Sequence, residues 1–268
     1  MGHGHSFRRN PRKPFIEFPF GLRCKFNHIV IRVNSRRVRN VVMRICSRLC
    51  SALVHFHNPT LWPNELRAAV ATSCRVTPSF ITEAEENELL REVEPHMKRL
   101  RYEKNHWDDA IHLYREREQR KWSPANEIVI QRIRDASFPL DAQHLTYVHI
   151  LDLHKDGVIK PHIDSIRYCG DVITGVCLLS DAVMRLRHKD RKNELIVDLM
   201  LPRRCLYRMG EEGRYEFTHE VLSNEESMFN GQRVEKTRRI SIICRDLPHP
   251  EHQAEAAAIK MKPIPEAA

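Results

Sequence analysis

The stretch LTYVHILDLHKDGVIKPHIDS, residues 145–165, marks the point at which the sequence changes from a helical to a strand-like pattern. Its first nine residues form an apolar run, and we expect a glycine turn at Asp156-Gly157 before a second extended stretch. Similar short runs follow at residues 172–180, 182–188, 194–201, 204–209, 214–222 and 239–246. Roughly eight short strands at this spacing predict an all-β sandwich or barrel.

Two helices are predicted upstream of these strands. Thr82 and Glu85 fit a capping box, and the apolar residues that follow at helical spacing predict a helix over residues 82–100 with one face on the core. Ser123-Pro124 provides the start of a second helix, which Phe138-Pro139 ends. Between them, residues 101–122 are polar with interspersed aromatic residues, as in an exposed helix. The predicted class is therefore α+β and mainly β.

The net charge of +9 is concentrated at the front of the chain. Residues 1–55 contain 12 Lys or Arg and one acid, Glu17, which leaves 32 bases and 34 acids in residues 56–268. Binding to a phosphate backbone requires clustered bases on the binding face, so this near-neutral remainder argues against it. We expect a basic, mostly disordered extension over residues 1–75, one folded domain over residues 76–248 and a disordered tail over residues 249–268.

The eight cysteines contain no C-x-x-C pair, and four lie singly in apolar, strand-like runs. This pattern indicates reduced, buried thiols and not a zinc site or a disulfide framework. No apolar run approaches the roughly 18 to 20 residues that a membrane span requires. We therefore expect a chain without a membrane span. We also expect the protein to be a monomer.

His162-Ile163-Asp164 is the candidate metal-binding motif. On an extended strand, residues i and i+2 point the same way and can bind one ion, whereas on a helix they cannot. Two His and one carboxylate on one face of the ion are the ligands of non-haem Fe(II) oxygenases. The motif alone is a weak signal. The copies at residues 106–108 and 188–190 are set aside, because the first lies in a polar segment of helical character and the second opens a charged turn.

The third ligand is expected from a later strand, where His219 lies beside alternating apolar residues. A single histidine on a strand is more often structural, but a strand with two arginines, Arg239 and Arg245, follows it. Both share a face with Ser241. Arginines on the inner side of an apolar strand need anions, and either a dicarboxylic acid or a structural Asp or Glu would serve, the latter mainly for Arg245.

The combination of H-x-D, a distal His and R-x-S-x-x-x-R resembles the AlkB-like Fe(II)- and 2-oxoglutarate-dependent dioxygenases. The segments ITEAEENELLREVEP, RYEKNHWDDAIH, VHILDL, IKPHIDSIRYCG, YEFTHEVL and RRISIICRDLP carry the resemblance, which covers residues 76–248. It implies a double-stranded β-helix, or jelly roll, flanked by the N-terminal helices. It also implies Fe(II), 2-oxoglutarate and O2, with the metal held by His162, Asp164 and His219 and the cosubstrate by Tyr207, Arg239, Ser241 and Arg245.

The resemblance is strongest to mitochondrial members of this family, which are described as lacking the full nucleotide lid. It implies a protein hydroxylase linked to fatty-acid metabolism and programmed necrosis. The alternative is a nucleic-acid N-demethylase acting on mitochondrial RNA, because Trp107, Tyr114 and Trp122 lie where a lid would be. A catalytically dead binding protein is disfavoured, because every ligand position holds a competent residue.

Residues 43–75 contain Arg44, Arg48, Arg67 and Arg75 but only one acid, Glu65. This composition is typical of a mitochondrial transit peptide, and a disordered basic tail is the alternative. We expect a protein of the mitochondrial matrix whose mature chain begins within roughly residues 60–80.

Overall fold

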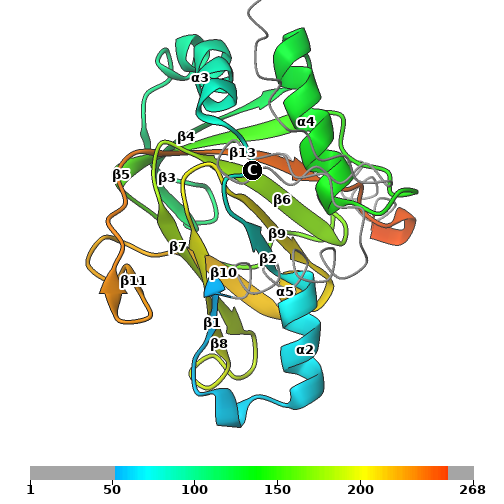
Figure 1. Cartoon of the computed structure of the whole chain (residues 1–268), viewed down its shortest axis with the longest axis vertical. Coiled ribbons are helices and arrows are strands. Elements are labelled where there is room, and N and C mark those ends of the chain that lie inside the picture. The colour runs from blue at the N-terminus through cyan, green and yellow to red at the C-terminus, as the bar shows by residue number, and fades with distance from the viewer. Residues whose placement is uncertain (1–51, 253–268) are drawn as a thin grey trace, which may run out of the picture. The chain divides into compact units, whose positions relative to one another are not determined.

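The computed structural model describes residues 52–252, which form a mainly antiparallel β-structure (Figure 1). Its helical elements are η1 (Pro59–Leu61), α2 (Asn64–Ser73), α3 (Glu83–Met97), α4 (Pro124–Ser137) and α5 (Glu211–Tyr215). Its strands are β1 (Val54–Phe56), β2 (Arg75–Thr77), β3 (Glu103–Asn105), β4 (Ile111–Gln119), β5 (Val148–His162), β6 (Val172–Leu178), β7 (Ala182–His188), β8 (Ile196–Leu201), β9 (Leu206–Gly210), β10 (Phe217–Val221), β11 (Met228–Phe229), β12 (Gln232–Arg233) and β13 (Arg239–Arg245).

The long strand β5 joins the two halves of the main sheet, whose order is β1-β8-β7-β10-β5-β13-β6-β9-β2. Its first half pairs with β13, where Leu153 lies opposite Arg239, and its last residue, His162, lies opposite His219 of β10. One apolar cluster contains residues from both halves, among them Leu151 of β5 and Leu186 of β7. The predicted jelly-roll class, mainly β with flanking helices, is confirmed.

Both predicted helices are present, and they cover the outer face of one half of the sheet (Figure 1). Thr82 caps α3, accepting from the Glu85 backbone N–H at 3.2 Å while the Glu85 carboxylate accepts from the Thr82 N–H at 2.7 Å. The helix ends at Met97, slightly before the predicted residue 100. Apolar residues of α3 and α4, such as Leu89 and Ile133, pack against the outward side chains of the sheet.

Strand β13 shows how the sheet separates its two faces. Ile240, Ile242 and Cys244 belong to the apolar cluster beneath the helices. Arg239 and Ser241 alternate with them and point into the interior of the fold. The period-two pattern of this strand therefore places the polar side chains inside, as the sequence predicted.

The exposed helix expected over residues 101–122 is wrong. These residues form β3 and β4, which pair antiparallel with Glu103 opposite Tyr114, and β4 pairs with β5 along its length. Tyr114 is buried, whereas Trp107 in the connecting turn is 85% exposed. The alternation of aromatic, Glu and Arg residues has a period of two, which suits a strand with one face toward a cavity better than it suits a helix.

The turn expected at Asp156-Gly157 is also wrong, because β5 continues through both residues. The pairing of β4 with β5 is irregular between His112 and Tyr114, where Leu113 has a φ of 52°. A Cβ at Gly157 would lie 2.7 Å from the Leu113 carbonyl oxygen and 2.8 Å from that of His112. Gly157 therefore gives the irregular part of β4 room to approach.

Two boundaries also differ from the prediction. Arg214 and Tyr215, expected in a strand, belong to α5. More importantly, the fold includes residues before 76: β1 pairs with β8, β2 begins at Arg75, and Trp62 is 4% exposed. A basic composition predicted disorder here, but the apolar residues between the arginines pack into the core. The predicted tail lies outside the described residues from 253 onward.

Replacing Trp62 by Ala should destabilise the domain by roughly 3 to 5 kcal/mol, the usual cost of removing a buried Trp. Its indole donates to the His57 carbonyl at 2.8 Å and stacks on Phe217, two residues before His219, with ring centroids 5.8 Å apart. Urea unfolding of the full chain measures the change. Leu61→Ala is the matched control, because this neighbour is 46% exposed and should change little. Equal stability of the two variants would contradict the packing.

Candidate active site

A cavity of about 880 Å³ opens between the two halves of the sheet. The structure brings all seven predicted site residues together on its walls: His162, Asp164, Tyr207, His219, Arg239, Ser241 and Arg245. They come from β5 and the loop after it, and from β9, β10 and β13. Residues up to 83 positions apart in sequence are therefore gathered by strand pairing.

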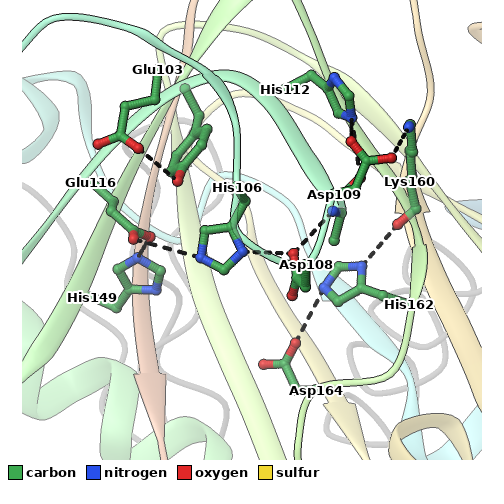
Figure 2. A network of polar contacts seen from close by, with 12 residues as sticks. Glu103, His106, Asp108, Asp109, His112, Glu116, His149, Lys160, His162 and Asp164 are labelled. Carbon is green, nitrogen blue, oxygen red and sulfur yellow. Dashed lines mark hydrogen bonds and ion pairs between the residues drawn. The ribbon is translucent and has the colours of Figure 1, made fainter. Parts of the chain in front are cut away.

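His162, Asp164 and His219 have one ligand atom each within 4.8 Å of one another, and they are the only such group of three among residues 52–252. Asp164 Oδ1 lies 3.3 Å from His162 Nε2 and 3.8 Å from His219 Nε2. The direct pairing of β5 with β10 places the two imidazoles side by side, and Figure 2 shows His162 and Asp164 facing each other. Two imidazoles and one carboxylate fit Fe(II).

The protonation states of the three candidate ligands favour metal binding, because a metal ion binds deprotonated groups. Burial opposes a charge on Asp164, but Arg245 and the two histidines hold the pKa of its carboxyl well below its usual range. Burial and the neighbouring His162 lower the pKa of His219 to about 3, so its imidazole is neutral. Burial lowers the pKa of His162, but the hydrogen bond and charge of Asp164, together with the Lys160 carbonyl and the charge of Asp108, outweigh burial and raise it. The carboxylate and His219 are thus ready to bind, and a metal must displace a proton only from His162 at mildly acid pH.

Arg239 presents a buried guanidinium to the same cavity. The side chain is 2% exposed, and its Nη2 contacts Cys177 Sγ at 3.1 Å and Ser241 Oγ at 3.2 Å, while Nε has no hydrogen-bond partner. Burial raises the pKa of the Cys177 thiol, but a hydrogen bond with Cys205 and the charge of Arg239 lower it to about 6. A buried arginine with an unpaired N–H fits a carboxylate ligand, which would accept two parallel hydrogen bonds.

Arg245 binds a carboxylate of the protein itself. Its Nε and Nη2 lie 3.1 and 3.0 Å from Asp164 Oδ2. This carboxylate belongs to the candidate metal ligand. Because Arg245 holds Oδ2, Oδ1 of Asp164 faces the two histidines. Contact of Arg245 with the cosubstrate stays a prediction, since a guanidinium has five N–H donors and these contacts use three.

Tyr207 and Ser241 lie beside Arg239. The Tyr207 hydroxyl is 3.1 Å from Ser241 Oγ, and the guanidinium carbon of Arg239 lies 5.9 Å from the centre of the Tyr207 ring. Gly175, opposite Tyr207 on β6, makes space for the ring, because a Cβ there would meet the hydroxyl at 2.7 Å. Sequence reasoning missed Gly175, although a glycine inside an apolar strand is itself a signal of close approach.

Sequence reasoning named only Trp107 at the mouth of the cavity, as a lid residue, and missed its neighbours. The turn between β3 and β4 carries His106, Trp107 and Asp108, which line the opening together with Glu116 and Tyr168. Figure 2 shows His106 and Asp108 close to His162, and the two side chains contact each other at 2.6 Å. The 106–108 copy of H-x-D was rightly set aside as a ligand pair, but its helical setting was wrong.

Strand context alone does not single out His162-Ile163-Asp164. A fourth copy of the motif, His154-Lys155-Asp156, lies on the same strand, where its own side chains contact each other at 3.5 Å and are partly exposed. What distinguishes His162 is its pairing with His219, a long-range property of the sheet. The thiols behave as predicted: the five cysteines that the structure describes, 74, 169, 177, 205 and 244, are free and buried.

Comparison with known proteins identifies the family of this chain. Residues 53–245 match the 2OG-Fe(II) oxygenase superfamily. The chain belongs to this family. It is 47% identical over 173 residues to the mouse and bovine proteins named alpha-ketoglutarate-dependent dioxygenase alkB homolog 7, mitochondrial, a match that covers 65% of this chain and 78% of each relative. A prolyl-4-hydroxylase of Pseudomonas putida superposes with a TM-score of 0.48 and 14% identity, over 69% of this chain and 99% of that one.

The family membership fixes the kind of enzyme. The chain is an AlkB-like 2-oxoglutarate-dependent dioxygenase, and its cofactors are Fe(II), 2-oxoglutarate and O2. The donor set of His162, Asp164 and His219 fits the metal, and the unpaired guanidinium of Arg239 fits a carboxylate of the cosubstrate.

Replacing His162, Asp164 or His219 by Ala should remove binding of one Mn(II) per chain, because each change deletes one of only three protein ligands. Mn(II) serves as a redox-silent substitute for Fe(II), and calorimetry measures its affinity. His188→Ala is the control, since His188 belongs to a discarded H-x-D copy outside the cavity. Undiminished affinity in His162→Ala would refute the assignment.

Arg239→Ala should weaken 2-oxoglutarate binding by about 2 to 4 kcal/mol, because a charge-assisted bidentate contact is lost. Arg239→Lys should recover only part of it, since an ammonium offers a point charge in place of a planar fork. Mn(II) binding without cosubstrate should stay near wild type. The adjacent Arg238 faces outward, to Asp152 and Glu94 at 2.6 Å, so Arg238→Lys is the control. Normal succinate formation by Arg239→Ala would place the cosubstrate elsewhere.

Proposed function

We propose that this dioxygenase hydroxylates a protein side chain in mitochondria. The supporting observation is the cavity mouth, which carries the carboxylates of Asp108, Glu116 and Glu118. Two of the arginines that line the cavity, Arg239 and Arg245, lie inside, where Ser241 and Asp164 engage them. A phosphate backbone would meet acids at the entrance, and such binding needs clustered bases.

The roles of the site residues form part of the proposal. His162, Asp164 and His219 would hold Fe(II), and Arg239 with Tyr207 and Ser241 would hold the distal carboxylate of 2-oxoglutarate. Arg245 would act through Asp164, which it orients. Bound Fe(II), 2-oxoglutarate and O2 supply the oxidant that places one oxygen atom on a substrate C–H bond, while 2-oxoglutarate leaves as succinate and CO2.

The protein's contribution is to orient these groups and to exclude water from them. Leu151 and Ile243 form an apolar part of the cavity wall, between the mouth and the pocket around Arg239. Because these apolar side chains exclude water, the local dielectric constant is low and the attraction between Arg239 and a carboxylate is stronger.

The second candidate function is N-demethylation of mitochondrial RNA, and two exposed aromatic side chains favour it. Trp107 is 85% and Tyr168 is 59% exposed, and both line the mouth. Exposed aromatic rings can stack on unpaired bases. The same oxidation on an N-methyl carbon gives an unstable hemiaminal that releases formaldehyde, whereas a hydroxylated side-chain carbon persists.

One pair of measurements separates the two functions. Mitochondrial proteins from cells that contain the wild-type chain or His162→Ala are compared by mass spectrometry, and protein hydroxylation predicts peptides 16 Da heavier only with the wild type. In parallel, the purified enzyme is incubated with methylated RNA oligonucleotides. Formaldehyde release there, without any +16 Da peptide, would replace the protein-hydroxylase proposal by RNA demethylation.

The mitochondrial location rests on the names of the two mammalian relatives and on the basic front segment. We place the protein in the matrix and link it to fatty-acid metabolism and programmed necrosis, as the family resemblance implies. Because β1 pairs with β8, we revise the cleavage site from residues 60–80 to a position before Leu53. N-terminal sequencing of the protein from isolated mitochondria checks this; an intact Met1 would contradict import with cleavage.

Within residues 52–252 the structure contains no helix long and apolar enough to cross a membrane. A monomer with one metal per chain remains part of the proposal.

A further inference from the structure

A continuous series of polar contacts runs from the cavity mouth to the candidate metal ligand Asp164. Arg245 on β13 holds Asp164 Oδ2, and its Nη1 lies 3.1 Å from Nδ1 of His149 on β5. Nε2 of the same imidazole lies 2.8 Å from Glu116 Oε2 on β4 (Figure 2). His149 and Glu116 both line the cavity, and neither is among the seven predicted site residues.

The chemistry of these groups fixes the hydrogen positions. An arginine can only donate, so Nδ1 of His149 must offer its lone pair to Arg245. The neutral imidazole then carries its single hydrogen on Nε2, where it donates to the Glu116 carboxylate, which can only accept. Glu116 therefore selects the one tautomer of His149 that can receive Arg245. With the hydrogen on Nδ1, imidazole and guanidinium would confront each other as two donors.

The orientation of Arg245 matters because Asp164 has two oxygens and only one faces the histidines. Oδ1 lies near both His162 Nε2 and His219 Nε2, while Oδ2 is held by Arg245. A guanidinium that turned away would release Oδ2, and the carboxylate could rotate about its side-chain bond. Partners that orient a metal ligand in this way affect metal binding even though they do not touch the ion.

We propose that His149 and Glu116 are positioning residues of the metal centre, which act through Arg245 to keep Asp164 Oδ1 directed at the ion. The proposal concerns the organisation of the site and holds for either candidate substrate. A purely structural role is a poorer explanation, because β4 and β5 are already joined by eight paired positions. The Glu116 side chain is also 36% exposed, where an ion pair adds little stability.

Two substitutions of His149 separate its two hydrogen bonds. In His149→Asn the amide oxygen stands near the place of Nδ1 and can still accept from Arg245, but the contact with Glu116 is lost. In His149→Gln the amide reaches the place of Nε2 and can still donate to Glu116, but Arg245 loses its acceptor. Both variants replace the ring by a smaller amide, so they are matched for lost packing.

The experiment measures Mn(II) affinity of the full chain by calorimetry without cosubstrate, together with the electron paramagnetic resonance spectrum of the bound ion. His149→Gln should weaken Mn(II) binding about tenfold or more and change the spectrum, as expected for loss of a group that orients a ligand. His149→Asn should stay close to wild type in both. Unfolding in urea should show the two variants equally stable.

Glu116→Gln provides an independent test. A glutamine amide can donate to Nε2 and so permit the wrong tautomer, which should weaken Mn(II) binding in the wild-type background. In the His149→Asn background the same change should add nothing, since no tautomer remains to be selected. This variant also serves if His149→Gln fails to fold.

The control is His112→Gln, which alters a histidine on β4 whose carboxylate partner is Asp109, at 3.0 Å. It should bind Mn(II) like the wild type. Equal loss of affinity in His149→Asn and His149→Gln would overturn the proposal, and so would wild-type affinity in His149→Gln and Glu116→Gln. Loss of affinity in the His112 control would show that general damage to the hairpin explains the effect.

Discussion

The burial of Arg239 is the constraint on which the interior of this protein depends. A guanidinium that is 2% exposed cannot shed its charge, so the surrounding strands must supply acceptors for it. Ser241 from the same strand and Cys177 from β6 do so, and the pKa of Cys177 falls to about 6 in response. The compensation is incomplete, because Nε has no partner. A carboxylate of 2-oxoglutarate would complete it, and this is the role that we propose for the pocket around Arg239.

Strand β5 connects the pocket around Arg239 to the candidate metal ligands. Leu151 and Leu153 lie opposite Ser241 and Arg239, and ten or so residues later the same strand ends at His162, opposite His219. A continuous strand is stiffer than a loop, so the distance between the two subsites is fixed by backbone pairing. Gly157 lets β4 approach at the irregular point between them. The expected turn at Asp156-Gly157 does not form, because β5 pairs with β4 on both sides of these residues and stays extended through them.

Sequence alone predicted those parts of the fold whose signals are local. The Thr82 cap, the Ser123-Pro124 helix start and the alternation along Arg239–Arg245 depend on neighbouring residues, and the structure shows all three. It failed where the deciding contact is distant in sequence. Trp62 lies in a basic segment, yet it stacks on Phe217 across the fold. The β3–β4 hairpin has a mixed polar and aromatic pattern. This pattern indicates a strand only once it is known that one face of β4 lines the cavity. The two H-x-D copies on β5 show the same limit of local sequence signals. Both lie on one strand, and only the pairing with β10 distinguishes His162 from His154.

The fold constrains the charges at the two ends of one row of paired residues in different ways. Neighbouring strands place Glu116, Leu151, Ser241 and Cys177 in one row, from β4 through β5 and β13 to β6. The inner end of this row meets Arg239, and its outer end is an acid at the mouth. The inner end is constrained by burial, because any change there leaves a charge unpaired. The outer end, Glu116, is 36% exposed, so burial does not constrain its charge. Glu116 is constrained in another way, because its contact with His149 couples the β3–β4 hairpin to Asp164.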